Sequence, residues 1–302
     1  MATQPIPAQH IPRQPDSRTR VNRVFRQGID HLVTGLAILA TVLVLIPLAA
    51  ILIYLLYKGF SSLNLAFFTK IPAPVGETGG GMANAIVGSG AILALASLIG
   101  IPIGIAAGVY LAEFGQGKTF GTLIRFTADV LNGVPSIVMG IAAYSLIVAH
   151  QKHFSGFAGG IALAIMMVPT ISRTTEEMLA TVPHSIREAA YGLGIPKWRV
   201  VLSVSLRTAS TGIITGCMLA FARVAGETAP LLFTALGNQF WSLNLNEPMA
   251  ALPLQIYVYA LSPYDDWHRL AWAGALVLIV MIMVSVTLVR IFAHRGTLKG
   301  GQ

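Results

Sequence analysis

The sequence predicts an all-α, polytopic membrane protein with six transmembrane helices and both termini in the cytoplasm. Hydrophobic residues make up 55% of the 302 residues and charged residues only 11%, and the mean hydropathy is +0.71. Apolar stretches recur at about the 20-residue length that a spanning helix needs. The Lys and Arg residues between these stretches collect on one side of the membrane. The net charge of +8 therefore describes topology and does not indicate a nucleic-acid partner.

Six stretches are predicted to span the membrane, and the fourth is the shortest. They are approximately Leu32–Tyr57, Asn84–Leu111, Phe126–Ala149, Gly156–Ser172, Ala209–Leu232 and Leu270–Val289. With the N-terminus inside, few cations fall in the external segments, namely Lys58, Lys70, Lys152 and Arg269. The remaining cations outside the spans are cytoplasmic, as the positive-inside rule expects.

The spans divide the chain into four parts. Residues 1–30 are rich in Pro, Gln and Arg and are expected to form a disordered cytoplasmic tail. Residues 31–83 hold the first span and an external loop, residues 84–292 hold the core, and residues 293–302 form a second cytoplasmic tail. The first span far exceeds the apolar core of a cleavable signal peptide, so we expect a retained helix.

The single cysteine and a pair of histidines do not indicate a redox or metal site. Cys217 falls within the fifth span, which excludes an intramolecular disulfide and favours a small packing residue. His150 and His153 flank Lys152 in a short external loop that offers no further ligands nearby. We therefore expect no bound metal.

A Gly-Lys-Thr triplet at residues 117–119 ends like a phosphate-binding P-loop. The P-loop needs another Gly five residues before the Gly-Lys pair, where this chain has Ala112, and it must follow a buried strand. Here the triplet follows a membrane span. We therefore expect ATP to be handled by a partner subunit and this chain to be non-catalytic.

The second span carries Gly100, Gly104 and Gly108 at four-residue spacing. This spacing makes one helix face smooth enough for another backbone to approach closely. An alternative is a hinge at Pro102, because a missing backbone donor in lipid must be compensated by neighbours.

Polar residues gather in the third span, near one membrane boundary. Asp129, Asn132 and Ser136 supply an acid, an amide and a hydroxyl around Pro135. One interpretation is helix packing around a proline kink, with Asp129 at the interface. The other is a broken helix that lines a pathway.

The fifth span contains two opposite charges, Arg223 and Glu227, which are predicted to share one helix face within the membrane. An isolated Arg at mid-span costs about 2.5–3.5 kcal/mol, so these side chains should face one another, other helices or a water-filled path. At about 1.5 Å per residue, Arg223 lies roughly 20 Å from the start of this span, which is a central depth.

Two roles are open for these charges and the adjacent Thr228. A forked guanidinium suits a tetrahedral oxyanion, and a carboxylate accepts a proton from a protonated oxyanion such as hydrogen phosphate but repels sulfate. Alternatively, Arg223 and Glu227 form a structural pair or gate that never touches substrate, with Pro230 kinking the helix beyond it.

A short polar segment, residues 187–196, must lie in water between two apolar stretches. Ala189 and Ala190 let a partner surface come close, and Arg187 and Glu188 precede them. Gly194 is expected to end the helix, with a proline two residues later preventing its continuation. An amphipathic helix lying on the bilayer is the alternative, but the four charges of this region leave no wide apolar face.

Four motifs together resemble the permease family of phosphate-specific ABC importers, of the PstA type. They are Gly-Gly-Gly-Met-Ala-Asn-Ala-Ile-Val-Gly at 79–88, Leu-Asn-Gly-Val-Pro-Ser-Ile-Val at 131–138, Arg-Glu-Ala-Ala-Tyr-Gly-Leu-Gly at 187–194 and Arg-Val-Ala-Gly-Glu-Thr-Ala-Pro at 223–230. The similarity covers roughly residues 79–290. It implies a type I ABC importer permease fold with residues 84–292 as the permease core. It also implies docking residues, Glu188, Ala189, Ala190 and Gly194, and two intramembrane charges, Arg223 and Glu227.

The resemblance further implies an inner-membrane subunit that forms half of a pore with a PstC-type permease. Two PstB-type ATPase subunits would use ATP and Mg, and a PstS-type phosphate-binding protein would deliver substrate outside, where residues 237–269 include a short predicted helix around Ala250–Leu261. Two alternatives stay open. One is a permease for another oxyanion, sulfate or molybdate. The other is a membrane-embedded enzyme, although no metal cluster, carboxylate pair or nucleophile with its base is visible in the sequence.

Overall fold

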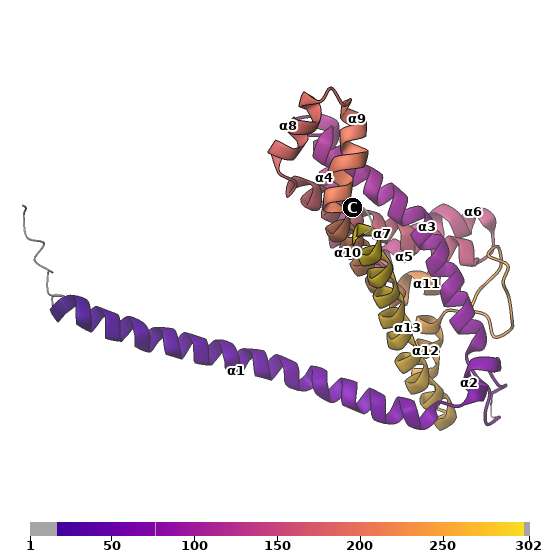
Figure 1. The fold of residues 1–302 in the computed structure, drawn as a ribbon. Coiled ribbons are helices and arrows are strands. Elements are labelled where there is room, and N and C mark those ends of the chain that lie inside the picture. Colours follow the sequence, from indigo (N-terminus) through magenta and orange to yellow (C-terminus); the bar gives the residue numbers. More distant parts are fainter. Residues whose placement is uncertain (1–16, 76, 299–302) are drawn as a thin grey trace, which may run out of the picture. The chain divides into compact units, whose positions relative to one another are not determined.

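The computed structural model describes residues 17–75 and 77–298, and in these ranges it is helical, with no β-strand (Figure 1). Five helices are long and apolar enough to span a membrane, and a bent helix pair supplies a sixth candidate. The chain divides into two compact units, residues 1–54 and residues 55–302, each of which is described by itself. The helices are α1 (Ser17–Ser62), α2 (Leu65–Thr69), α3 (Ala83–Glu113), α4 (Thr119–Gly133), α5 (Ser136–Ala143), α6 (Ala149–Gln151), α7 (Gly156–Ala180), α8 (His184–Gly192), α9 (Lys197–Val200), α10 (Leu206–Ala225), α11 (Ala229–Thr234), α12 (Leu252–Ala260) and α13 (Asp265–Leu298).

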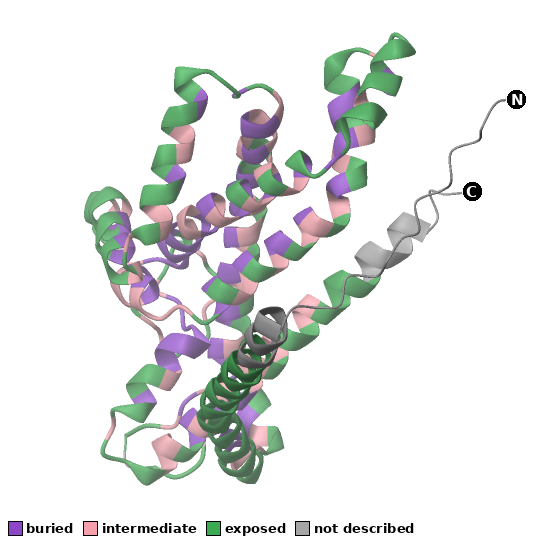
Figure 2. Ribbon diagram, turned by 90° about the vertical axis from the view of Figure 1, so that its left-hand side faces the viewer, coloured by how far each residue is buried: buried purple, intermediate pink, exposed green. Residues whose placement is uncertain are grey.

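Helix α1 begins at Ser17, well before the predicted first span. Residues 17–30 are therefore helical, contrary to the predicted disordered tail, and residues 1–16 lie outside the described residues. From residue 26 to residue 54 every side chain of α1 is exposed (Figure 2). Exposed apolar side chains along a whole span are suited to contact with lipid or another subunit. At the other end, residues 293–298 continue α13, and residues 299–302 lie outside the described residues.

The core of the second unit is the packing of α3 against α7. Gly100, Gly104 and Gly108 are buried on the face of α3 that meets α7. A Cβ atom added at these glycines would come within 3.1 Å, 2.7 Å and 2.5 Å of the Cβ atoms of three α7 residues, Met167, Ile171 and Thr175 respectively. The predicted close helix approach is confirmed, because both faces repeat every four residues. Helix α3 runs through Pro102 without a break.

The third span is broken, as one of its two interpretations predicts. Helix α4 ends at Gly133, and the chain turns by 109° before it continues from Ser136 to Gln151. This second arm is α5, a π-helical turn (Tyr144–Val148) and α6. Val134 and Pro135 adopt extended conformations, and the proline, which disfavours helix at the residue before it, forms the break.

The fourth and fifth spans have other limits than predicted. Helix α7 continues past Ser172 to Ala180, so the shortest predicted span is a full-length one. The fifth spanning helix starts at Lys197 rather than Ala209 and ends at Ala225. It comprises α9, a π-helical turn (Val201–Ser205) and α10. Cys217 is buried in α10, as expected of a packing residue.

The predicted external helix is present as α12, which packs against α13. Tyr259 of α12 is buried and stacks on Trp267, with ring centroids 4.5 Å apart. The loop between α11 and α12 is held to the start of α7. Backbone N–H groups of Ser155, Gly156 and Phe157 donate to carbonyl oxygens of the 234–247 segment at 2.9, 2.9 and 2.7 Å. These bonds satisfy N-terminal donors of α7 that have no partner within the helix.

Candidate functional site: two interrupted spans and a docking loop

The two interrupted spans meet at their breaks. Helix α5 begins after the bend at Val134–Pro135, and helix α11 begins after the break at Gly226–Thr228. The two short helices pack together, with Gly140 of α5 buried against Pro230 of α11. The polar residues that precede each short helix therefore belong to one structural unit, which the sequence order of the spans does not reveal.

Arg223 and Glu227 are not on one helix face, contrary to the prediction. Helix α10 ends at Ala225, so Arg223 lies in its last turn and Glu227 lies beyond it. Among the described residues neither side chain makes an ion pair, and Arg223 is exposed while Glu227 is half-buried. The break at Gly226 separates the two side chains, so the predicted structural pair is wrong in this structure. The C-terminal end of α10 favours a cation at Arg223, through the helix dipole.

The central depth predicted for Arg223 assumed that the fifth span starts at Ala209, but in the structure this helix starts at Lys197. Because the spanning helix starts at Lys197, Arg223 lies near the far end of a 29-residue helix. The charge is thus placed at the edge of a helix break, where backbone and side chain can reach water or a partner.

The polar residues of the third span lie on both sides of its bend. Asn132 is in the last turn of α4 and its Oδ1 accepts a hydrogen bond from Thr170 Oγ1 of α7 at 3.2 Å. Asp129 is exposed one turn earlier on α4, and Ser136 is the first residue of α5. The structure therefore favours the broken helix over a simple proline kink.

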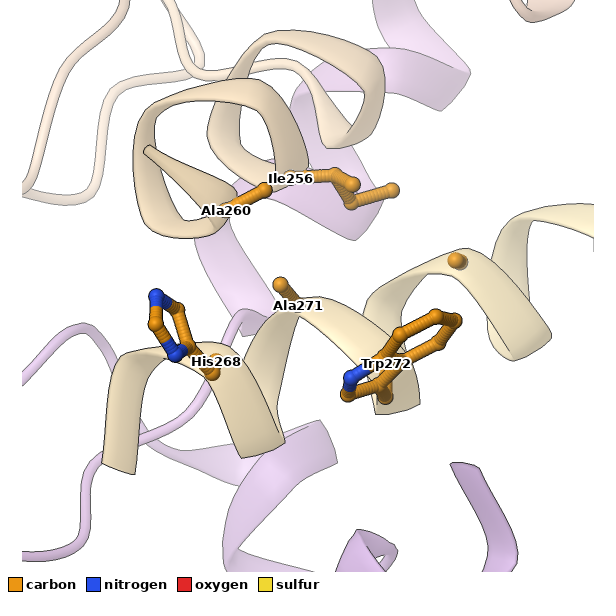
Figure 3. Close-up of a pocket in the computed structure, with 6 residues that line it drawn as sticks. Ile256, Ala260, His268, Ala271 and Trp272 are labelled. Atoms are coloured by element: carbon orange, nitrogen blue, oxygen red, sulfur yellow. The ribbon is translucent and has the colours of Figure 1, made fainter. Parts of the chain in front are cut away.

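An apolar pocket of about 310 Å³ lies elsewhere, between α12 and α13 (Figure 3). Its lining residues are Ile256, Ala260, His268, Ala271, Trp272 and Ala275. His268 is hydrogen-bonded to the carbonyl oxygen of Ser262 at 2.7 Å, so it closes a turn. None of the predicted pathway residues lines this pocket.

The polar segment after α7 folds as predicted, into helix α8 followed by a tight stop. Gly194 has a φ of +75°, the left-handed conformation that glycine adopts at no steric cost. The N–H of Gly194 donates to the carbonyl of Tyr191 at 2.9 Å, and that of Ile195 to the carbonyl of Ala190 at 3.4 Å. This pair of bonds is a Schellman motif, which ends the helix where the sequence predicts.

The predicted docking residues do not all face outward. Glu188 and Ala189 are exposed, whereas Ala190 is buried and only Ala189 is available to a partner surface. Arg187 also turns inward. Its Nη2 lies 3.3 Å from a carboxylate oxygen of Glu113 and donates to the carbonyl of Leu179 at 2.5 Å. Arg187 therefore positions the loop rather than presenting a charge on it.

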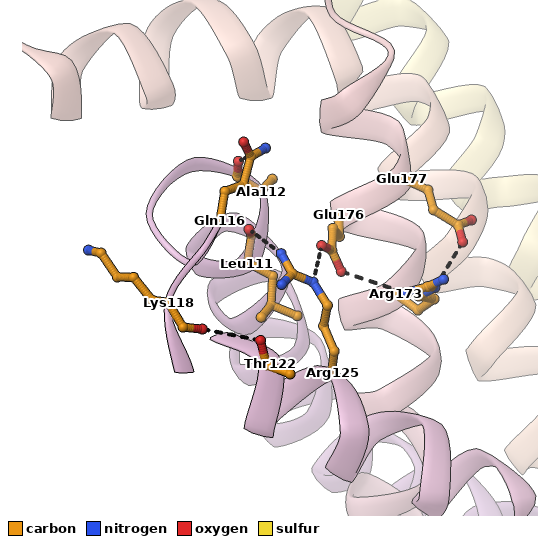
Figure 4. Close-up of polar contacts among 9 residues, drawn as sticks. All are labelled: Leu111, Ala112, Gln116, Lys118, Thr122, Arg125, Arg173, Glu176 and Glu177. Atoms are coloured by element: carbon orange, nitrogen blue, oxygen red, sulfur yellow. Dashed lines mark hydrogen bonds and ion pairs between the residues drawn. The ribbon is translucent and has the colours of Figure 1, made fainter. Parts of the chain in front are cut away.

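Sequence reasoning missed two carboxylates at the same end of the helices, Glu113 of α3 and Glu176 of α7. The Nε of Arg125 in α4 donates to Glu176 at 2.7 Å and its Nη2 donates to the Leu111 carbonyl at 3.0 Å, so one guanidinium joins α3, α4 and α7 (Figure 4). Arg173 pairs with Glu177 at 3.0 Å on the exposed side. The sequence could have indicated these two acids, because each follows closely after the cytoplasmic end of a predicted span.

The sequence of this chain is similar to a described family and to named proteins. Residues 100–296 match the model of the family described as binding-protein-dependent transport system inner membrane component. A protein of Yersinia pestis, "Phosphate transport system permease protein PstA", is 46% identical over 277 residues, which cover 91% of this chain and 94% of that protein. The chain belongs to the PstA permease family. A PstA relative in Pasteurella multocida is 48% identical over 87% of this chain and 94% of that protein.

Solved structures confirm the ABC importer permease fold for this PstA-family chain. One is the inward-facing MetNI methionine ABC transporter, with a TM-score of 0.54, 17% identity and coverage of 73% of this chain and 98% of that chain. A bacterial ABC transporter involved in the import of alginate has a TM-score of 0.61 at 13% identity, covering 93% of this chain and all of the other. The chain is thus a multi-pass inner-membrane permease subunit, and ATP hydrolysis belongs to another component of the transporter.

Proposed function

We propose that this chain is the membrane permease subunit of an ATP-driven importer of inorganic phosphate, in which it forms half of the translocation pathway. The observation that carries the proposal is the identity of 46–48% to PstA permeases over nearly the whole chain. The motifs around Asn132 and Arg223, which the sequence singles out, lie within the aligned core.

The proposed pathway comprises the polar residues at the two breaks, which are Asp129, Asn132, Ser136, Arg223, Glu227 and Thr228. Because Arg223 is exposed and makes no ion pair among the described residues, its guanidinium is free to face a tetrahedral oxyanion. Five N–H donors in a planar fork suit phosphate oxygens. A carboxylate at Glu227 would accept the proton of hydrogen phosphate and repel sulfate. The exposed position of Arg223 and the half-buried position of Glu227 also suit a pathway completed by a second permease.

The proposed ATPase contact is the outer side of the segment at residues 187–198, here called the docking loop. Its exposed surface combines Glu188 and Ala189 with large apolar side chains, and Tyr191, Leu193 and Trp198 are 40%, 80% and 57% exposed. Exposed apolar groups rimmed by charge mark a protein interaction site. We propose that two PstB-type ATPases, which bind ATP and Mg, dock here and at the corresponding loop of a PstC-type permease, and that a PstS-type binding protein supplies phosphate outside.

The substrate is tested by labelled-phosphate uptake at low external phosphate, in cells with and without this chain. Excess arsenate, sulfate and molybdate are added separately. We expect chain-dependent uptake that is inhibited by arsenate alone. Inhibition by sulfate or molybdate would instead assign the chain to another oxyanion.

The docking assignment has a separate test. Glu188→Arg reverses an exposed charge on α8 and should reduce the ATPase subunit that copurifies with the permease. Glu177→Gln, which alters an exposed carboxylate of α7 that is not one of the proposed contact residues, serves as the control. Unchanged association of the Glu188→Arg variant would show that the loop is not the ATPase contact.

A further inference from the structure

Glu113, the last residue of α3, is contacted from both sides of the docking loop. Arg187 of α8 places its Nη2 3.3 Å from Glu113 Oε1. Lys197, the first residue of α9, donates from Nζ to the backbone carbonyl of Glu113 at 2.6 Å and lies 4.6 Å above the ring of Phe114. The two cations flank the exposed part of the loop in sequence. Both ends of the loop are therefore fastened to the same point of α3.

The contact is enclosed. The side chain of Glu113 is 5% exposed and that of Arg187 is 13% exposed. Low exposure strengthens an ion pair and makes the loss of one partner costly. An acid at the C-terminal end of a helix is also opposed by the helix dipole, so the Glu113 carboxylate needs the Arg187 cation. Arg187 has no second carboxylate partner among the described residues, and its guanidinium also donates to the Leu179 carbonyl near the end of α7.

The end of α3 is rigidly joined to the rest of the core. Gly100, Gly104 and Gly108 bring α3 against α7 along three turns, where an added Cβ would meet α7 atoms at 3.1 Å or less. A close-packed helix pair of this kind moves as a unit, because packed interiors are nearly incompressible. A displacement of α8 that pulls on Glu113 is thus passed to α3 and α7 together.

We infer that Glu113 is a positioning residue that couples the docking loop to α3, so that movement of the bound ATPase reaches the membrane helices through the Arg187–Glu113 pair. The inference rests on the proposed function, since it assumes an ATPase on the loop. It assigns no contact between Glu113 and substrate or ATP.

The experiment uses the complete transporter in proteoliposomes, with ATP hydrolysis and phosphate uptake measured on the same sample. Glu113→Gln keeps the size of the side chain and removes its charge. We expect the ATPase to copurify and hydrolyse ATP as before, while phosphate moved per ATP falls about fivefold or more, the range of ordinary coupling energies. The exchange Glu113→Arg with Arg187→Glu should restore much of the ratio. Glu177→Gln is the control and should keep the wild-type ratio.

A second readout does not depend on the substrate. A spin label at Ser185→Cys, an exposed α8 residue outside the proposed contact residues, in a Cys217→Ala background, reports the mobility of α8 in the assembled complex. Glu113→Gln should raise that mobility, and the charge exchange should lower it again. A wild-type ratio together with wild-type mobility in Glu113→Gln would overturn the inference, as would loss of the ATPase from that complex. If the wild-type complex moves no phosphate, the proposed function fails, and the spin-label result still decides the role of Glu113.

Discussion

Gly140 of α5 and Pro230 of α11 are in direct backbone contact, because a Cβ atom added at Gly140 would lie 2.8 Å from the Cα of Pro230. The contact joins the short helix that follows the bend of the third span to the short helix that follows Glu227. The proposed pathway residues at these two breaks therefore flank helices whose close approach requires a residue without a side chain at position 140.

Replacing Gly140 by Ala should disturb this contact. The nearest atom belongs to the backbone, which cannot rotate away, so α11 must shift. The free energy of unfolding should fall by about 1–3 kcal/mol. We expect phosphate uptake to fall, measured alongside the thermal unfolding midpoint in detergent. Gly90→Ala is the matched control, since a Cβ there meets nothing within 4 Å. Equal uptake by both variants would show that the α5–α11 contact does not matter for transport.

Arg223→Ala and Glu227→Gln should each abolish uptake and leave the transporter assembled. Neither side chain makes an ion pair among the described residues, so removal leaves no buried charge behind. The measurement is labelled-phosphate uptake, with copurification of the ATPase as the test of assembly. Normal uptake in either variant would remove that residue from the pathway.

Arg125 and Glu176 should stabilise the core as a pair. Each single change, Arg125→Gln or Glu176→Gln, should lower the free energy of unfolding by about 1.5–3 kcal/mol, as expected for a hydrogen bond between charged groups. The double variant should cost less than the sum of the two single variants, because each single variant already removes the 2.7 Å contact between Arg125 and Glu176. Glu176 keeps Arg173 at 3.9 Å in the Arg125→Gln variant. Thermal unfolding in detergent measures the stability of the wild type, the two single variants and the double variant.

The comparison pair for that cycle is Arg173 and Glu177, which are 48% and 57% exposed. An exposed pair at this spacing contributes about 0.3–0.5 kcal/mol, so its removal should change the midpoint little. If the double variant loses as much free energy of unfolding as the two single variants together, the ion pair between Arg125 and Glu176 does not stabilise the fold.

Gly194→Ala should weaken ATPase docking through the loop backbone. At a φ of +75° an alanine costs about 1–2 kcal/mol, because its Cβ approaches the following carbonyl. Gly192→Ala is a close control, since Gly192 is helical and a Cβ there meets nothing within 4 Å. The fraction of ATPase that copurifies should fall for the first variant alone. Retention of the ATPase by Gly194→Ala would show that the Schellman stop is not needed for docking.

Much of the fold could be predicted from local patterns in the sequence. The second span, the glycine face of α3, the end of α8 at Gly194 and the external helix α12 depend on hydropathy, residue size or backbone preference over a few residues. Such properties are local, so they can be recognised without the fold. For the third span the sequence left a kinked and a broken helix open, because apolar composition continues across the bend and does not give its angle.

The candidate site was predicted less completely. Residue types around Asn132 and Glu188 were sufficient to indicate the loop and, as one of two interpretations, the break in the third span, whereas the break after Ala225 in the fifth span was not predicted. The pairing of Arg223 with Glu227 was wrong, because four-residue spacing brings side chains together only while the helix continues. Nothing in the sequence spacing indicated which side of the loop Arg187 and Ala190 would face.

The sequence by itself determined that this protein is an α-helical membrane protein, which segments are apolar enough to cross a bilayer, and which polar motifs interrupt them. These properties depend on the free energy of transferring side chains from water to lipid and on backbone preferences, both of which are set by residues close together in the sequence. Only the tertiary structure decided that Gly140 meets Pro230, that Arg125 reaches Glu176, and that Glu113 receives Arg187. Such contacts join residues far apart in the chain, and they form because helices of the second unit pack side by side, as α3 does on α7.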